Sequence, residues 1–189
     1  TLLAPLTGTA ETTVEFRDEF RAVSYSGNDG TQDWSTDWIE LGESTDPSDG
    51  SISVETEHCS SGTCLSLGRS AGDDASIQRA FQSSGANSVT ISFDYERHLR
   101  APGGGMVRLL ASRTGFSTWV EIDTWQLTES DAGQQSASYD LMTGTSAFSM
   151  IRFELTGNDN DSYMDIDNVS VRVTYDTTAP PAFDQDLGD

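Results

Sequence analysis

The sequence contains no lysine, so its ten basic residues are all arginines, set against 31 acidic residues and a net charge of −21. So negative a surface repels nucleic acid and anionic lipid, which excludes the partners that basic domains usually bind. It suits cations, and it suits salty water, where screening weakens the repulsion between like charges. Also absent is any run near about 18 consecutive apolar residues, so no segment is expected to insert into a membrane.

Cysteine is equally scarce, with Cys59 and Cys64 as its two occurrences, in the segment HCSSGTC. Across a hairpin, such a spacing brings two Cα atoms near the roughly 5.5 Å of a disulfide. We therefore expect a disulfide; the alternatives are free thiols, or a metal site that adds His58. A disulfide would indicate an oxidising compartment, and hence an extracellular or cell-surface protein.

Helix signals are nearly absent, since no long stretch repeats its apolar residues with a period of 3.6. Instead, about ten short β-branched and aromatic runs alternate with a period of two, separated by Gly, Ser, Asn and Asp. This pattern predicts an all-β fold, a two-sheet antiparallel β-sandwich of the jelly-roll type, over residues 13–175. Residues 1–12 and the acidic, proline-containing residues 176–189 are expected to be arms or linkers. The alternative is that one of them pairs with a sheet edge of another subunit.

Strand phase places a carboxylate on an apolar face in two segments. In VEFRDEF, Asp18 shares a face with the valine and the phenylalanines, and in YMDIDNVSVRV, Asp167 shares a face with the valines. Two buried carboxylates brought together repel unless a cation lies between them. The loop after the first segment offers hard oxygen ligands of the kind that Ca²⁺ takes. We predict a structural calcium site formed by Asp18, Asn28, Asp29, Asp33 and Asp167; the alternative is that these acids cap turns on a solvated rim.

Two tryptophans, Trp34 and Trp38, follow this loop directly. We expect them to cover the core and clamp the loop, because a large aromatic side chain beside a cation packs well and keeps water out. The alternative is a platform on which a sugar ring stacks.

The segment TWVEIDTWQ, residues 118–126, alternates in a way that separates two faces. Val120 and Ile122 would lie on one face, and the other would carry Trp119, Glu121, Asp123 and Trp125. Indole rings stack on the apolar faces of sugars and carboxylates accept hydrogen bonds from hydroxyls, so we predict a glycan-binding strip. The alternative is that one of the tryptophans packs between the sheets.

The same segment resembles the E-x-D-x-x-E signature of jelly-roll glucanases. There Glu121 would be the nucleophile and Asp123 its helper, but the acid/base position holds Gln126, which cannot exchange a proton at neutral pH. A G-x-S-x-G nucleophile elbow is also missing from the sequence. We therefore expect no catalytic residues and a protein that is not an enzyme.

Taken together, the segments FRDEF, YSGNDGTQDWSTDWIE, SIQRAF, VTISFDY, TWVEI, IRFELT and MDIDNVSV resemble jelly-roll modules of bacterial secreted and cell-surface proteins. The pattern is similar to MAM-type and carbohydrate-binding-module sandwiches and covers residues 13–174. The resemblance implies a β-jelly roll that often holds a structural calcium near Asp167. We therefore predict an extracellular, calcium-stabilised binding or adhesion module for a glycan or another cell-surface ligand. The alternative is a structural subunit of a filament or tandem-repeat fibre, linked through its arms to neighbouring modules or to copies of itself.

Overall fold

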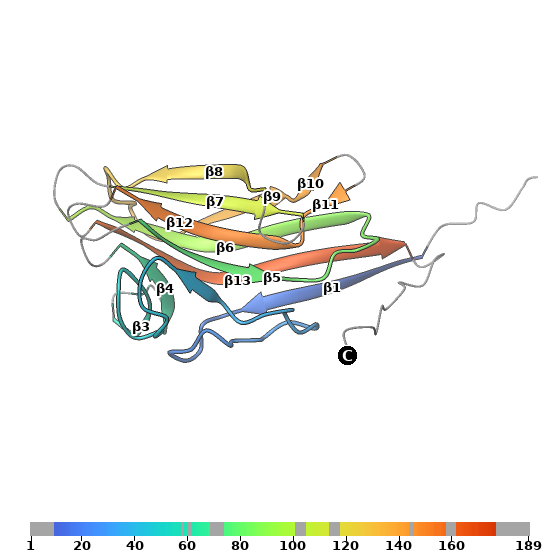
Figure 1. Ribbon diagram of the computed structural model, residues 1–189, viewed down its shortest axis with the longest axis horizontal. Coiled ribbons are helices and arrows are strands. Elements are labelled where there is room, and N and C mark those ends of the chain that lie inside the picture. Colours follow the sequence, from blue (N-terminus) through green and yellow to red (C-terminus); the bar gives the residue numbers. More distant parts are fainter. Residues whose placement is uncertain are drawn as a thin grey trace, which may run out of the picture.

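The computed structural model describes residues 10–57, 59, 62–68, 74–100, 105–113, 118–143, 146–157 and 162–176. These residues form thirteen strands and no helix, arranged as two antiparallel sheets and a small hairpin (Figure 1). The predicted all-β, two-sheet sandwich is therefore confirmed. Nothing in the described part of the chain is a helix long and apolar enough to cross a membrane. Most residues of the predicted terminal arms lie outside the described residues, so the roles of the arms stay predictions.

The first sheet has six strands in the order β3-β4-β13-β6-β9, with β1 also paired to β13. Its strands are β1 (Glu11–Asp18), β3 (Ile52–Glu55), β4 (Cys64–Leu67), β6 (Ser88–His98), β9 (Gln135–Asp140) and β13 (Tyr163–Asp176). β13 pairs with β6 along one of its edges. Along its other edge, β13 pairs with β4 up to Ile166 and with β1 from Val169 onward. This edge is therefore interrupted at Asp167 and Asn168, and we call that interruption the edge gap.

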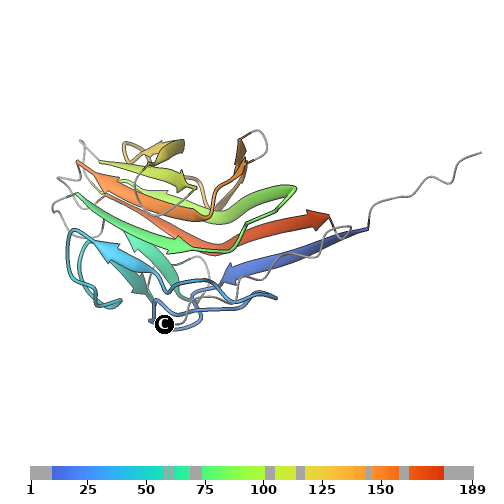
Figure 2. The same ribbon diagram turned by 45° about the vertical axis from the view of Figure 1, so that its right-hand side comes forward.

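The second sheet has five strands in the order β2-β5-β12-β7-β8. They are β2 (Ile39–Leu41), β5 (Ala75–Ala80), β7 (Met106–Ser112), β8 (Val120–Gln126) and β12 (Met150–Thr156). A short hairpin of β10 (Met142–Thr143) and β11 (Ser146–Ala147) lies apart from both sheets. Figure 2 shows the two sheets as stacked layers, with β1 running beside β13.

The core lies between the inner faces of the two sheets, where alternate residues of the central strands meet. Phe93 of β6 contacts Phe153 of β12 edge to face, with ring centroids 5.2 Å apart. Trp34 and Trp38 are buried in the same core, which confirms the prediction that they cover it. This packing is the physical reason for the period of two in the sequence, because one face of each central strand is kept from water.

The predicted disulfide is present and closes the turn before β4. Cys59 and Cys64 are bonded, with Cα atoms 5.7 Å apart. His58, the third member of the alternative metal site, lies outside the described residues. Because both sulfurs are bonded to each other, the thiol and metal alternatives for this pair are excluded.

Tyrosine–carboxylate pairs join the two sheets at their edges. At one edge the Tyr25 hydroxyl donates to Glu40 of β2 over 2.7 Å and lies 3.2 Å from the carbonyl oxygen of Ile52 in β3. At the other edge the Tyr139 hydroxyl of β9 donates to the carboxylate of Asp123 in β8. These hydrogen bonds therefore tie the two layers together at both edges of the sandwich.

Candidate functional site

A β-bulge in β13 changes the face on which the predicted metal ligands lie. Asp167 is paired with Asp94, but the next pair joins Ser170 to Ser92, so one extra residue is inserted at Asn168, whose φ is 53°. Opposed residues share a face, so Asp167 faces outward with Asp94, whereas Val169 faces the core. The prediction that Asp167 shares the apolar face with the valines was wrong, and Asp18 and Asp167 lie on opposite faces of the sheet.

Asp18 remains in the core, and its counter-charge is an arginine. The side chain is 0 % exposed and lies 2.7 Å from Nη1 of Arg79 in β5, which is 2 % exposed. The same carboxylate accepts hydrogen bonds from the Trp38 Nε1–H over 3.0 Å and from the Phe20 backbone N–H over 2.8 Å. Burial raises the pKa of Asp18, and these donors and Arg79 oppose that rise. With these partners the Asp18 carboxylate is satisfied within the protein.

The two tryptophans of the loop hold Arg79 in place. The guanidinium carbon of Arg79 lies 4.7 Å from the ring centre of Trp34 and 5.6 Å from that of Trp38, within the range of a cation–π interaction. Arg79 also donates from Nε to the carbonyl of Thr36 over 2.9 Å. The segment SIQRAF already indicated that Arg79 faces the core. Arg79 lies two residues after the buried Ile77, and in a strand such residues share a face.

The remaining predicted ligands of the loop make hydrogen bonds within the protein, and Asp29 holds the loop to β1. Asp29 accepts a hydrogen bond from the Glu19 backbone N–H over 2.9 Å, and its own N–H donates to the Arg17 carbonyl over 2.8 Å. Asn28 donates to the carboxylate of Asp33. The loop approaches β1 so closely that these contacts cover part of its free edge, which blunts it against other strands.

The outer face beside the bulge gathers four carboxylates. Asp94 of β6 is opposite Asp167, and Glu96 is opposite Asp165, so two cross-strand pairs of like charge are neighbours. Asp165 is 5 % exposed and Asp167 8 % exposed. Between the four lies a cavity of about 10 Å³, the size of about one water-sized group. Directly opposed like charges destabilise a sheet, so these carboxylates repel one another, and Asp165 lies 3.2 Å from Nε2 of His98.

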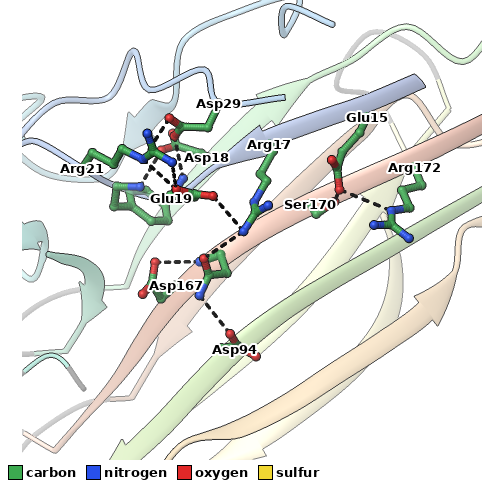
Figure 3. Close-up of polar contacts among 12 residues, drawn as sticks. Glu15, Arg17, Asp18, Glu19, Arg21, Asp29, Asp94, Asp167, Ser170 and Arg172 are labelled. Carbon is green, nitrogen blue, oxygen red and sulfur yellow. Dashed lines mark hydrogen bonds and ion pairs between the residues drawn. The ribbon is translucent and has the colours of Figure 1, made fainter. Parts of the chain in front are cut away.

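The surroundings of Asp167 disfavour its charged form. Burial, together with the charges of Asp94, Glu19 and Asp18, raises its pKa to about 6, although the Asn168 N–H donates to it. At the edge gap a depression of about 400 Å³ is lined by Glu19, Arg21, Gly62, Thr63, Asp167 and Asn168. Figure 3 shows the contacts around Asp167: the neighbouring Asn168 donates from its backbone N–H to Asp167 and from its side-chain amide to Asp94, and it accepts from Arg17, which is paired with Glu19.

The fit of these residues to a calcium ion is partial. The edge gap offers hard oxygens from Glu19, Thr63, Asp167 and Asn168, which is the donor type that calcium requires. However, Glu19 is already paired with Arg17 over 2.8 Å. Within the described residues, no three side chains of His, Cys, Asp or Glu are arranged to hold a metal ion. An ion here would therefore depend on hydroxyl, amide, backbone or water oxygens in addition to carboxylates.

A second bulge, in β8, divides the predicted glycan-binding strip. Asp123 is opposite Leu109, but Glu121 is opposite Leu110, so Ile122 is the inserted residue. Trp125 is only 6 % exposed, and its ring packs on Phe93 at 5.7 Å. The prediction that all four residues share one face was therefore wrong: Asp123 and Trp125 face the core side, and Glu121 faces outward. The two carboxylates of the glucanase-like pattern, Glu121 and Asp123, are separated for the same reason.

Trp119 remains at the outer face of the five-stranded sheet, where it meets residues that sequence reasoning missed. The guanidinium carbon of Arg152 in β12 lies 4.0 Å from the Trp119 ring centre. The buried Gln78 holds Arg152 in place, because Oε1 of Gln78 accepts a hydrogen bond from Nε of Arg152 over 3.0 Å. Trp119 is partly buried, whereas Trp34, Trp38 and Trp125 are fully buried, so it is the tryptophan that can present a ring surface to a ligand.

Charged groups continue this surface beside Trp119. Arg108 of β7 is paired with Glu154 of β12 and lies 3.7 Å from Glu121 of β8. Arg152 lies 3.9 Å from the other oxygen of Glu154. We call Trp119, Arg152, Gln78, Glu154, Arg108 and Glu121 the Trp119 face. Its two arginines and two glutamates sum to zero charge, in a molecule whose net charge is −21.

Comparisons with known proteins place the fold. No family model matches the sequence, and no curated protein matches it. Among solved structures, the K1 cleaved adhesin domain of Lys-gingipain from Porphyromonas gingivalis W83 is similar, with a TM-score of 0.57 and 13% identity over 83% of this chain and 96% of that one. The K2 cleaved adhesin domain of Lys-gingipain gives 0.55 and 13% over 83% and 98%. A family 29 carbohydrate-binding module gives 0.51 and 11% over 94% and 99%. These likenesses confirm the predicted resemblance at the level of the fold.

Proposed function

We propose that this domain is a non-catalytic, extracellular binding or adhesion module that recognises a neutral glycan through the Trp119 face. The observation that carries the proposal is the pairing of the partly buried Trp119 ring with Arg152, beside further side chains that donate and accept hydrogen bonds. A sugar needs both kinds of contact, since its C–H faces are apolar and its hydroxyls are polar. The zero net charge of the face suits a ligand without charge, because neither sign is left uncompensated.

The fold and the disulfide support this assignment. The sandwich is shared with gingipain adhesin domains and with family 29 carbohydrate-binding modules, one of which was determined with mannohexaose. A disulfide between Cys59 and Cys64 suits an oxidising, extracellular setting. Neither requires the glycan of those proteins to be the ligand of this one.

The proposal includes a calcium site, but it is located at the edge gap and not in the core. There Asp167, Asn168, Glu19 and Thr63 would hold the ion with further oxygens. Bound calcium would neutralise the like charges of Asp167 and Asp94, and would join the end of β1 to the start of β4. Its role would be structural, because the Trp119 face belongs to the other sheet.

The test is binding of soluble neutral oligosaccharides, with mannohexaose and cellohexaose as probes, to the intact domain and to Trp119→Ala. A tryptophan at the centre of a binding face is typically worth about 2 kcal/mol or more, so we expect affinity to fall at least about tenfold. The matched control is Val120→Ala, the exposed residue that follows Trp119 and begins β8. Equal affinity in Trp119→Ala and the parent domain would exclude the Trp119 face as the binding site.

A further inference from the structure

A second polar depression lies on the outer face of the six-stranded sheet. It has a volume of about 400 Å³, and its lining includes Glu15, Arg17, Ser92, Asp94, Ser170 and Arg172. We call it the polar trench. It belongs to β1, β13, β6 and β9, whereas the Trp119 face belongs to the other sheet, so the two face away from each other.

The trench is formed by a change of side-chain size along one row of paired residues. Arg17 of β1 is opposite Ser170 of β13, which is opposite Ser92 of β6. The two serines leave room at the centre. Arg17 and Asp94 stand on one side of this room, and Glu15 and Arg172 stand on the other (Figure 3). Since neighbouring strands are about 4.8 Å apart, the row presents hydroxyls at regular steps across the sheet.

The charged walls of the trench are fixed before any ligand arrives. Glu15 accepts hydrogen bonds from the Ser170 hydroxyl over 2.7 Å and from Arg172 over 3.2 Å. On the opposite wall, Asp94 accepts from Ser136 over 2.6 Å and from Asn168 over 2.9 Å. Held side chains lose little conformational entropy when a ligand binds, which lowers the cost of association.

The composition of the trench selects a class of ligand. Arg17 and Arg172 balance Glu15 and Asp94, so neither an anion nor a cation finds net attraction there. Apart from Phe93 and Ala137, which pack into the core, the lining consists of charged, amide and hydroxyl side chains, so the trench offers no apolar pocket for the side chains of a peptide. What it offers is many donors and acceptors at fixed positions, which matches a neutral chain rich in hydroxyl groups.

We propose that the polar trench is a second binding site, for an extended neutral polyhydroxyl chain such as an oligosaccharide, that lies across β1, β13 and β6. The inference goes beyond the function proposed for the Trp119 face, because it assigns a separate surface on the opposite sheet. A domain with both sites holds two chains at once, or two parts of one chain.

The experiment is a titration of isotope-labelled protein with mannohexaose and cellohexaose, followed by amide chemical shifts. Three variants are compared with the parent domain: Ser92→Tyr, which fills the trench; Ser88→Tyr, on the same strand and face but outside the trench; and Trp119→Ala. We expect saturable shifts at Ser92 and Ser170 that persist in Trp119→Ala and Ser88→Tyr but are lost in Ser92→Tyr.

A further variant, Arg172→Ala, guards against misfolding of Ser92→Tyr, because the Arg172 side chain is 68% exposed and its loss should not affect folding. We expect it to weaken binding in the trench several-fold. Shifts confined to the Trp119 face would overturn this inference and leave the proposed function standing. Shifts confined to the trench would do the reverse, and no saturable shift with either probe would overturn both.

Discussion

The ion pair between Asp18 and Arg79 gives the sharpest test of how this fold is stabilised. Replacement of Arg79 by methionine keeps an apolar stem of similar length but removes the charge that faces the buried carboxylate. Asp18 would keep its two hydrogen-bond donors, the Phe20 N–H and the Trp38 indole, but would have no cation. The Thr36 carbonyl would also lose its donor.

The expected loss follows from these contacts. Removal of one partner of a buried ion pair typically costs about 3–5 kcal/mol, because the other charge is left uncompensated. The lost hydrogen bond adds about 1 kcal/mol. We therefore expect Arg79→Met to lower the free energy of unfolding by about 4–6 kcal/mol. For a domain of this size that corresponds to a fall in the melting temperature of roughly 10–20 °C.

The assay is urea unfolding followed by tryptophan fluorescence, for Arg79→Met, Asp18→Asn and the double variant. The double variant should be more stable than Arg79→Met alone, since no charge remains buried. Arg172→Met is the matched control, because its ion pair with Glu15 is exposed on the arginine side and should contribute less than about 1 kcal/mol. The reasoning is refuted if Arg79→Met costs no more than Arg172→Met.

Further predictions concern pH, backbone fit and calcium. Burial raises the pKa of Glu40 to about 8, so between about pH 4.5 and 8 the folded state holds a proton that the unfolded state has lost. The free energy of unfolding should therefore fall over this range as the pH rises, by up to about 1.4 kcal/mol per pH unit. Glu40→Gln should flatten that part of a profile of melting temperature against pH. Gly30→Ala should lower the melting temperature much more than Gly85→Ala, because a Cβ on Gly30 would lie 2.1 Å from the Glu15 carbonyl oxygen, while one on Gly85 would have nothing within 4 Å and would add only the backbone strain of its φ of 76°. Calcium should raise the melting temperature relative to excess chelator, and Asp167→Asn should make that difference smaller. If the difference is unchanged in Asp167→Asn, or absent in the parent domain, the edge gap is excluded as a calcium site.

The fold class could be predicted from the sequence because it depends on a property of short segments. Strands buried on one face must alternate, and a sandwich needs many of them, so the period of two survives in almost every strand. The buried positions of Trp34 and Trp38, and the bond between Cys59 and Cys64, were also accessible, since each follows from residue type and local spacing.

The faces of the site residues could not be predicted because single inserted residues reverse them. Up to Asp167 in β13 and up to Glu121 in β8 the alternation is regular, and after Asn168 and Ile122 it continues with the opposite phase. The one local hint was Asn168, because asparagine tolerates the positive φ that this bulge adopts. Nothing comparable marks Ile122.

The counter-charge of Asp18 was missed for a different reason. A buried carboxylate was recognised, but calcium was predicted as its counter-charge, whereas the structure pairs it with an arginine 61 residues further along the chain in another sheet. Only the tertiary pairing shows that the inward-facing Arg79 meets it. The same limit applies to the Trp119 face, whose arginines and glutamates come from three different strands.

The pairing of the first and last strands has a mechanical consequence. Glu11 is opposite Asp176, so the described chain enters and leaves at the same end of two antiparallel neighbours (Figure 1). A force that pulls these two points apart opens the backbone hydrogen bonds in succession, starting from that end, instead of loading all eight residue pairs together. Peeling would then advance along β1 until it reached Asp18, where the bond to Arg79 anchors the strand to the opposite layer. Under tension the domain should therefore lengthen at low force first and resist strongly only at that anchor.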